Sequence, residues 1–179
     1  TYYSKAKGIN VWDLNGKKYL DFTMVGVGCS VLGYADKDIN EIGKKIINSG
    51  SLTTLNPPEE IELAEMLLSI HPWAEQVKYA RTGGEMMSVA VRLARAATGK
   101  EKILFCGYHG WHDWYLATNL KSTKRLNNHL LPGLDPLGVP KSLKDTMIPF
   151  RFNNEDDLRN IIKPNIKKCA AIILEPARD

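Results

Sequence analysis

Three short segments of the sequence place glycines or a proline beside side chains that can do chemistry. The first is Thr82-Gly83-Gly84-Glu85, which follows a short strand-like run and precedes a stretch of helical periodicity. Backbone N–H groups at a helix start are unpaired, and glycines let a ligand approach them closely, so the segment suits a phosphate. An ordinary strand-to-helix turn is the alternative from this segment alone. A Walker loop is excluded, because no Gly-Lys-Ser/Thr follows.

The second segment is Gly107-Tyr108-His109-Gly110, which follows the apolar run 103–106. Ligands of open α/β sheets bind at the carboxyl ends of strands, and here a phenol and an imidazole stand on a glycine-flanked loop. Core packing is the alternative for each aromatic residue, and we interpret Trp111 and Trp114 in that way. The pattern His109-x-x-His112-Asp113 lacks a helix that would place both histidines on one face, so no metal site is predicted.

The third segment is a buried-strand pattern over residues 170–174 that ends in Glu175-Pro176. A carboxylate at the end of a buried strand is costly unless it has a partner, which points to a cofactor or a basic group nearby. A solvated glutamate is the alternative, and it is favoured for this segment alone. A hydrolase ranks last, because the sequence contains no Gly-x-Ser-x-Gly nucleophile loop.

Strand and helix patterns alternate along the part of the chain that must position these segments. The predicted strands are residues 77–80, 103–106, 147–150 and 170–175, and the predicted helices are 38–48, 58–70, 85–98 and 155–163, the last ended by Pro164. This alternation predicts an α/β fold with a largely parallel sheet.

Two further segments have recognisable signals. Asn15-Gly16 stands between two alternating runs, which predicts a β-hairpin over residues 9–22, since both residues accept a positive φ. Residues 119–144 are rich in glycine and proline. A loop of that length inside a compact domain is often functional, and we expect a lid or channel wall.

The composition is that of a soluble globular protein, with 179 residues, 44% hydrophobic and 25% charged. No apolar run approaches about 18 residues, the length that a membrane-spanning helix needs, so no membrane contact is predicted. The net charge is +4 and the basic residues are scattered, which argues against nucleic acid as a partner. Three widely spaced cysteines predict neither zinc nor a disulfide framework and favour the reducing cytoplasm.

In their order and approximate spacing, the three segments resemble the class III pyridoxal-phosphate-dependent aminotransferases, and among them the glutamate-1-semialdehyde 2,1-aminomutases. The resemblance extends over most of the chain and includes Val11 to Asp21, Glu62 to Glu65, Arg92 to Arg95 and Thr98 to Ile103. It implies the fold-type I, aspartate aminotransferase-like architecture. Residues 1–50 would then be an N-terminal hairpin and helix that belong to the small domain. Residues 51–179 would be the first part of a truncated large domain that binds pyridoxal 5′-phosphate (PLP).

The resemblance also implies roles for individual residues. The family's Ser-Gly-Thr-Glu element falls on Thr82-Gly83-Gly84-Glu85, so the backbone of Gly83 and Gly84 would hold the cofactor phosphate and Thr82 would supply a hydroxyl. Tyr108 would stack on the pyridine ring and His109 would help to shape the site. Glu175 would lie near the substrate side of the cofactor. One departure matters most: the family's threonine after the first glycine is Gly84 here, which removes a hydroxyl from the phosphate site.

The resemblance places the family's Schiff-base lysine and its pyridinium-pairing aspartate beyond the Glu-Pro element. No catalytic residue is therefore expected in this chain, which ends at Asp179. The chain is then interpreted as the N-terminal part of a homodimeric aminotransferase or aminomutase for a small amino-acid or amino-aldehyde substrate, inactive by itself. The alternative is a degenerate or truncated relative that acts only in dimer contacts.

Overall fold

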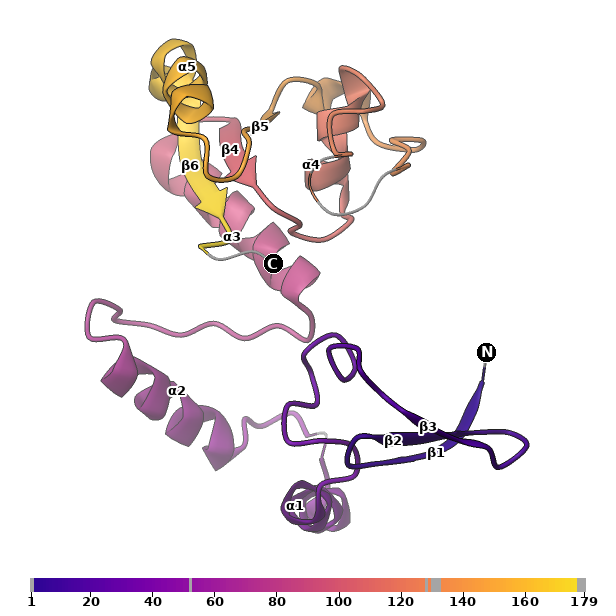
Figure 1. Ribbon diagram of the computed structural model, residues 1–179. Helices are drawn as coiled ribbons and strands as arrows, with labels where there is room; N and C mark the ends of the chain where they lie inside the picture. The colour runs from indigo at the N-terminus through magenta and orange to yellow at the C-terminus, as the bar shows by residue number, and fades with distance from the viewer. Residues whose placement is uncertain (1, 52, 128, 130–132, 177–179) are drawn as a thin grey trace. The chain divides into compact units, whose positions relative to one another are not determined.

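The computed structural model in Figure 1 describes residues 2–51, 53–127, 129 and 133–176. The chain divides between Glu75 and Gln76 into two compact units, which are described separately here. This division concerns compactness within the chain. The expected assignment of residues 1–50 to a small domain and of residues 51–179 to a large one stays a prediction.

The first unit contains a three-stranded antiparallel sheet of β1 (Tyr3–Lys7), β2 (Asn10–Asp13) and β3 (Lys18–Leu20), in that order. The hairpin predicted from Asn15-Gly16 is confirmed as β2–β3. Its turn is held by the Asp13 carboxylate, which accepts hydrogen bonds from the backbone N–H groups of Asn15 and Lys17, both at 2.9 Å. Only Gly16 takes a positive φ, of 81°, so the turn uses one left-handed residue rather than the expected two. The sequence patterns did not predict β1.

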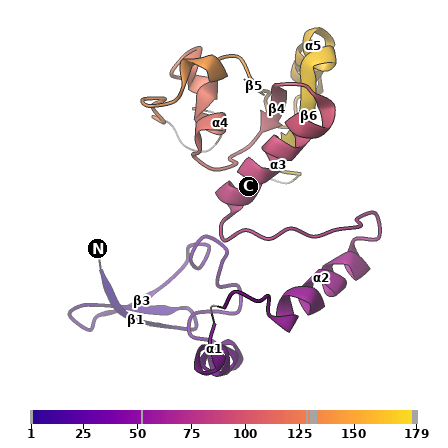
Figure 2. The ribbon, with the colours of Figure 1, turned by 180° about the vertical axis from the view of Figure 1, so that it is seen from behind.

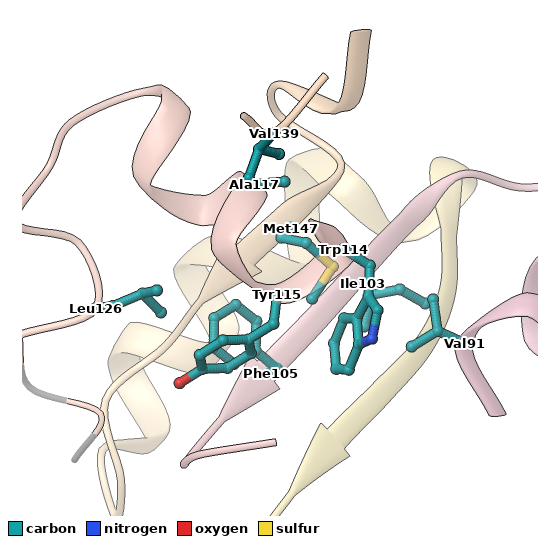
Figure 3. Packing of buried hydrophobic residues seen from close by; sticks show 9 residues of the cluster. All are labelled: Val91, Ile103, Phe105, Trp114, Tyr115, Ala117, Leu126, Val139 and Met147. Carbon is teal, nitrogen blue, oxygen red and sulfur yellow. The ribbon is translucent and has the colours of Figure 1, made fainter. Parts of the chain in front are cut away.

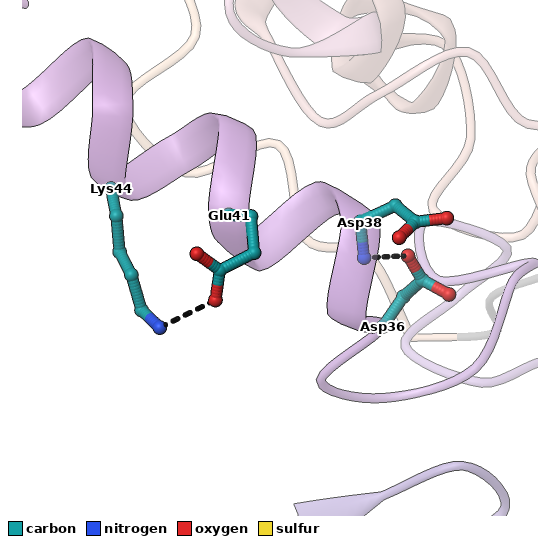
Figure 4. A network of polar contacts seen from close by, with 4 residues as sticks. All are labelled: Asp36, Asp38, Glu41 and Lys44. Carbon is teal, nitrogen blue, oxygen red and sulfur yellow. Dashed lines mark hydrogen bonds and ion pairs between the residues drawn. The ribbon is translucent and has the colours of Figure 1, made fainter.

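Two helices complete the first unit, α1 (Lys37–Ser49) and α2 (Pro58–Ile70), each within two residues of its predicted bounds. Asp36 caps α1 by accepting from the N–H of Asp38 at 3.1 Å, and Lys44 pairs with Glu41 at 2.9 Å on the solvated face (Figure 4). Among the residues that the structure describes, neither helix buries a side chain. The isoleucines on one stripe of α1, Ile39, Ile42 and Ile46, are therefore largely exposed.

The second unit is built on a parallel sheet with the order β5-β4-β6, seen from two sides in Figures 1 and 2. Its strands are β4 (Lys102–Cys106), β5 (Met147–Pro149) and β6 (Cys169–Leu174), and its longer helices are α3 (Gly83–Thr98) and α5 (Glu155–Asn165). The register places Ile103 opposite Met147 and Leu104 opposite Ile172. The predicted parallel α/β architecture is confirmed.

Both faces of the central strand β4 are covered. Ile103 and Phe105 face a cluster that includes Val91 of α3 and the buried aromatic residues of α4 (Asp113–Leu116), as Figure 3 shows. Leu104 and Cys106 face a second cluster with α5. All four of these strand residues are at most 1% exposed. Burial on two faces is why the strand is a continuous apolar run rather than an alternating one.

The glycine- and proline-rich segment 119–144 contributes to this core. Leu126 and Val139 pack in the cluster of Figure 3. The buried amide of Asn119 donates to the Leu134 carbonyl at 2.6 Å and accepts from the Leu126 N–H at 3.1 Å. The described part of the segment is thus tied to the sheet. Short 3₁₀ turns at Ala117–Leu120, Lys141–Leu143 and Ile166–Lys168 complete the unit.

Two predicted features are wrong. Residues 77–80 form no strand, because none of the described strands pairs with them and an extended segment becomes a strand only through a ladder. Pro164 does not end α5, which runs to Asn165. The proline removes a single N–H in the last turn, while the Ile166 N–H still donates to Ile162 and the Asn165 side chain bonds the Ile161 carbonyl at 2.8 Å.

No helix in the described part of the chain is long and apolar enough to cross a membrane.

Candidate functional site

The three segments singled out by their chemistry meet at one edge of the sheet in the second unit. Gly107 directly follows β4, and Glu175 directly follows β6. The two strands are parallel neighbours, so their carboxyl ends lie side by side. The start of α3 joins them, because a Cβ on Gly110 would lie 3.0 Å from the Cα of Gly84. The site therefore consists of two strand ends and one helix start.

The start of α3 carries two backbone donors for which the described residues offer no acceptor. Thr82 uses its hydroxyl to accept from the Glu85 N–H at 3.2 Å and its carbonyl to accept from the Met86 N–H at 3.1 Å. The Glu85 carboxylate turns back to the Arg81 and Thr82 N–H groups, which completes a capping box. No described residue accepts from the N–H of Gly83 or of Gly84. These two donors stand at the positive end of a 16-residue helix, which is the arrangement that binds a phosphate.

Capping by Thr82 gives a first prediction. Replacing Thr82 with alanine removes the acceptor for the Glu85 N–H, and we expect it to lower the free energy of unfolding by about 1 kcal/mol. Thr82→Ser retains the hydroxyl and should cost much less. Urea denaturation of the two variants measures the difference, and equal losses in both would contradict the capping role.

Gly107, which begins the second segment, allows close contact between the ends of β4 and β6. Gly107 has a φ of 103°, and a Cβ there would lie only 2.7 Å from the carboxyl carbon of Glu175. The Glu175 N–H also donates to the Cys106 carbonyl at 3.3 Å. The carboxylate of Glu175 is thus half-buried against the backbone of the Gly107 loop rather than solvated at a strand end.

Tyr108 and His109 point to different surroundings although they are adjacent. Tyr108 is half-exposed, and its ring is perpendicular to that of Tyr115, with the centroids 5.7 Å apart. His109 is 9% exposed, and its Nε2 lies 2.9 Å from the Cys106 carbonyl oxygen. A carbonyl can only accept, so Nε2 carries the proton. Tyr108 is therefore partly accessible at the edge of the site, while His109 fastens the loop from inside.

Residues that the sequence analysis did not select hold this loop in place. The Tyr115 hydroxyl donates to the Gly107 carbonyl at 3.0 Å, and Nδ1 of the buried His129 accepts from the Gly107 N–H at 3.3 Å. Tyr115 and His129 lie 8 and 22 residues away in sequence, and no local pattern links them to the loop. Of the two tryptophans interpreted as core, Trp114 is buried but Trp111 is 69% exposed, so that interpretation is wrong for Trp111.

A separate cavity of about 420 Å³ lies at the opposite edge of the sheet, near the start of β4. Charged side chains from several loops surround it: Lys100, Glu101, Lys102, Lys144, Asp145, Lys167 and Lys168. Beside it, burial lowers the pKa of the Arg95 guanidinium, which donates to the Glu101 carbonyl at 2.9 Å. None of the sequence-selected site residues lines this cavity, so the candidate site is placed at the carboxyl edge.

Comparison with known proteins identifies the relatives of the chain. The sequence model of the family "Aminotransferase class-III" matches residues 1–178. The chain is 30% identical over 176 residues to a 3-aminobutyryl-CoA aminotransferase of Cloacimonas acidaminovorans, covering 98% of the chain and 38% of the relative. It is 31% identical over 177 residues to a glutamate-1-semialdehyde 2,1-aminomutase of Thermoplasma volcanium, covering 98% of the chain and 41% of the relative.

A solved structure described as a transaminase with PLP bound has the same fold, with a TM-score of 0.83 and 23% identity. The match covers 98% of the chain and 40% of that structure. The chain therefore spans about two fifths of the length of these relatives.

Proposed function

The chain belongs to the class-III aminotransferase family, whose fold is type I and whose cofactor is PLP, and from this premise we propose that it is the N-terminal, phosphate-binding part of an aminotransferase or aminomutase. The substrate would be a small amino acid or amino aldehyde, and the complete protein would work as a homodimer in the cytoplasm.

The observation that carries this proposal is the pair of N–H groups on Gly83 and Gly84 at the start of α3, from which no described residue accepts. They fit a phosphate in charge and in geometry, since both donors stand at the positive helix end and neither glycine has a side chain to cover it. The Thr82 hydroxyl, which already accepts from Glu85, still has its proton to donate to a phosphate oxygen.

The remaining site residues complete the fit to a phosphorylated aromatic ring. Tyr108 is a half-exposed aromatic ring on which a pyridine ring would stack, and Tyr115 packs against it with its ring plane perpendicular. His109 holds the Tyr108 loop through Cys106, and Glu175 places a carboxylate at the same edge of the sheet. When bound, PLP supplies the electron sink for bond breaking next to the substrate amine. The protein's own work here is to bind and orient it.

Titration of the complete protein with PLP tests the proposal. We expect a saturable visible absorption band of lysine-bound PLP, with an affinity well above that for pyridoxal, which lacks the phosphate. The Schiff-base lysine would come from sequence outside this chain. A complete protein that contains that lysine and still gives no band would overturn the proposal and favour a non-catalytic relative.

A further inference from the structure

His112 lies directly over the first turn of α3. A Cβ built on Gly84 would come 2.9 Å from His112 Nε2 and 3.1 Å from its Cδ2, and a Cβ on Gly110 would come 3.6 Å from the same Cδ2. The imidazole therefore occupies the space that a side chain at position 84 would need. Gly84 allows this approach because it has no side chain. Gly110 allows it for the same reason, and its φ of 102° is one that glycine adopts readily.

The backbone that carries the His112 ring is held in place by hydrogen bonds. Its backbone carbonyl begins α4 by accepting from the N–H groups of Tyr115 at 2.9 Å and Leu116 at 3.1 Å. A hydrogen-bonded chain ties α4 to α3, because Trp114 Nε1 donates to Ser88 Oγ at 3.0 Å and this hydroxyl donates to the Gly84 carbonyl at 2.9 Å. His112 therefore belongs to a segment that hydrogen bonds tie to the start of α3.

The ring nitrogens of His112 have no protein partner in the described part of the chain; the ring only stacks on Trp111, with centroids 6.0 Å apart and planes 14° apart. A half-buried imidazole beside two free backbone donors is therefore available to a ligand. An imidazole N–H, like the N–H groups of Gly83 and Gly84, donates hydrogen bonds, and all three suit the same anion.

We propose that His112, the residue before α4, is a phosphate-binding residue of the cofactor site and supplies the side-chain donor that Gly84 lacks. This inference rests on the proposed function. It implies that a side chain at position 84 would have to displace the His112 ring, because the Cβ at 84 would come 2.9 Å from its Nε2. Gly84 then leaves room for the His112 ring and is not a loss from the site.

The test compares two ligands that differ only in the phosphate, PLP and pyridoxal, by equilibrium titration of the complete protein. We expect His112→Ala to weaken PLP binding about tenfold, the effect of one charge-assisted hydrogen bond, and to leave pyridoxal binding unchanged. Gly84→Thr should weaken PLP binding because the new side chain meets the ring. The double variant Gly84→Thr/His112→Ala should bind PLP more tightly than Gly84→Thr does, since it removes the conflict and restores a hydroxyl.

His71→Ala is the matched control, because His71 is an exposed histidine that precedes α3 and contacts only Trp73 among ring partners. It should change neither affinity. Equal weakening of PLP and pyridoxal by His112→Ala would show a merely structural role and overturn the inference, as would an unchanged PLP affinity. If His112→Ala fails to fold, the inference is tested by the other pair of variants. It is then overturned if Gly84→Thr/His112→Ala binds PLP no more tightly than Gly84→Thr. A wild-type protein that binds neither ligand would overturn the proposed function itself.

Discussion

Replacing Gly107 with alanine is expected to lower the free energy of unfolding by about 3 kcal/mol, through backbone strain and overpacking together. The φ of 103° is a conformation that side chains rarely adopt, and the new methyl group would meet the Glu175 carboxyl, 2.7 Å from its carbon. Because Tyr115 and His129 bond the same glycine, the loop cannot turn away without losing both hydrogen bonds. Urea denaturation of the complete protein measures the change.

Two further variants separate the causes of this loss. Gly107→Ala/Glu175→Ala removes the overlap but keeps the strained φ, so it should recover part of the stability and no more. Gly83→Ala is the matched stability control, since Gly83 begins a helix at an ordinary φ and a Cβ there meets nothing within 4 Å. A loss at Gly83 as large as that at Gly107 would show that the argument from φ and overlap is wrong.

Phe105→Ala is the second change with a large expected effect, a loss of about 3–5 kcal/mol in the free energy of unfolding. The ring is fully buried in the central strand and packs against Tyr115 at 5.2 Å and His129 at 5.4 Å between centroids. Truncation leaves a cavity beneath the residues that hold the Gly107 loop. We therefore expect PLP affinity to fall as well, although Phe105 lies beneath the loop and not among its candidate ligands.

Phe105→Leu keeps most of the volume and should cost well under half as much. Phe152→Ala serves as the positional control, because Phe152 is 40% exposed. Denaturation curves that place Phe105→Ala level with Phe152→Ala would contradict the assignment of Phe105 to the core.

Local signals predicted the elements well because the interactions that form them join near neighbours in sequence. The start of α2 follows from Pro58 and the two glutamates after it. The hairpin follows from Asn15-Gly16, although it is Asp13 that holds the turn. The α3 start follows from Thr82 and Glu85, three residues apart, which cap each other. The strand predicted for residues 77–80 is absent, because a strand forms only by pairing with another segment, and the local sequence does not show whether such a partner exists.

The sequence by itself determined the family, the parallel α/β pattern and the helix start that suits a phosphate, because each depends on the order of residues or on contacts within one turn. The tertiary structure alone decided that Gly84 lies under His112, that Glu175 packs on Gly107 and that Trp111 is exposed while Trp114 is buried. These facts depend on which strand ends become neighbours in the sheet and on how closely backbones approach. No spacing in the sequence encodes such distances, so the role of a histidine two residues beyond a glycine loop emerges only when the elements are packed.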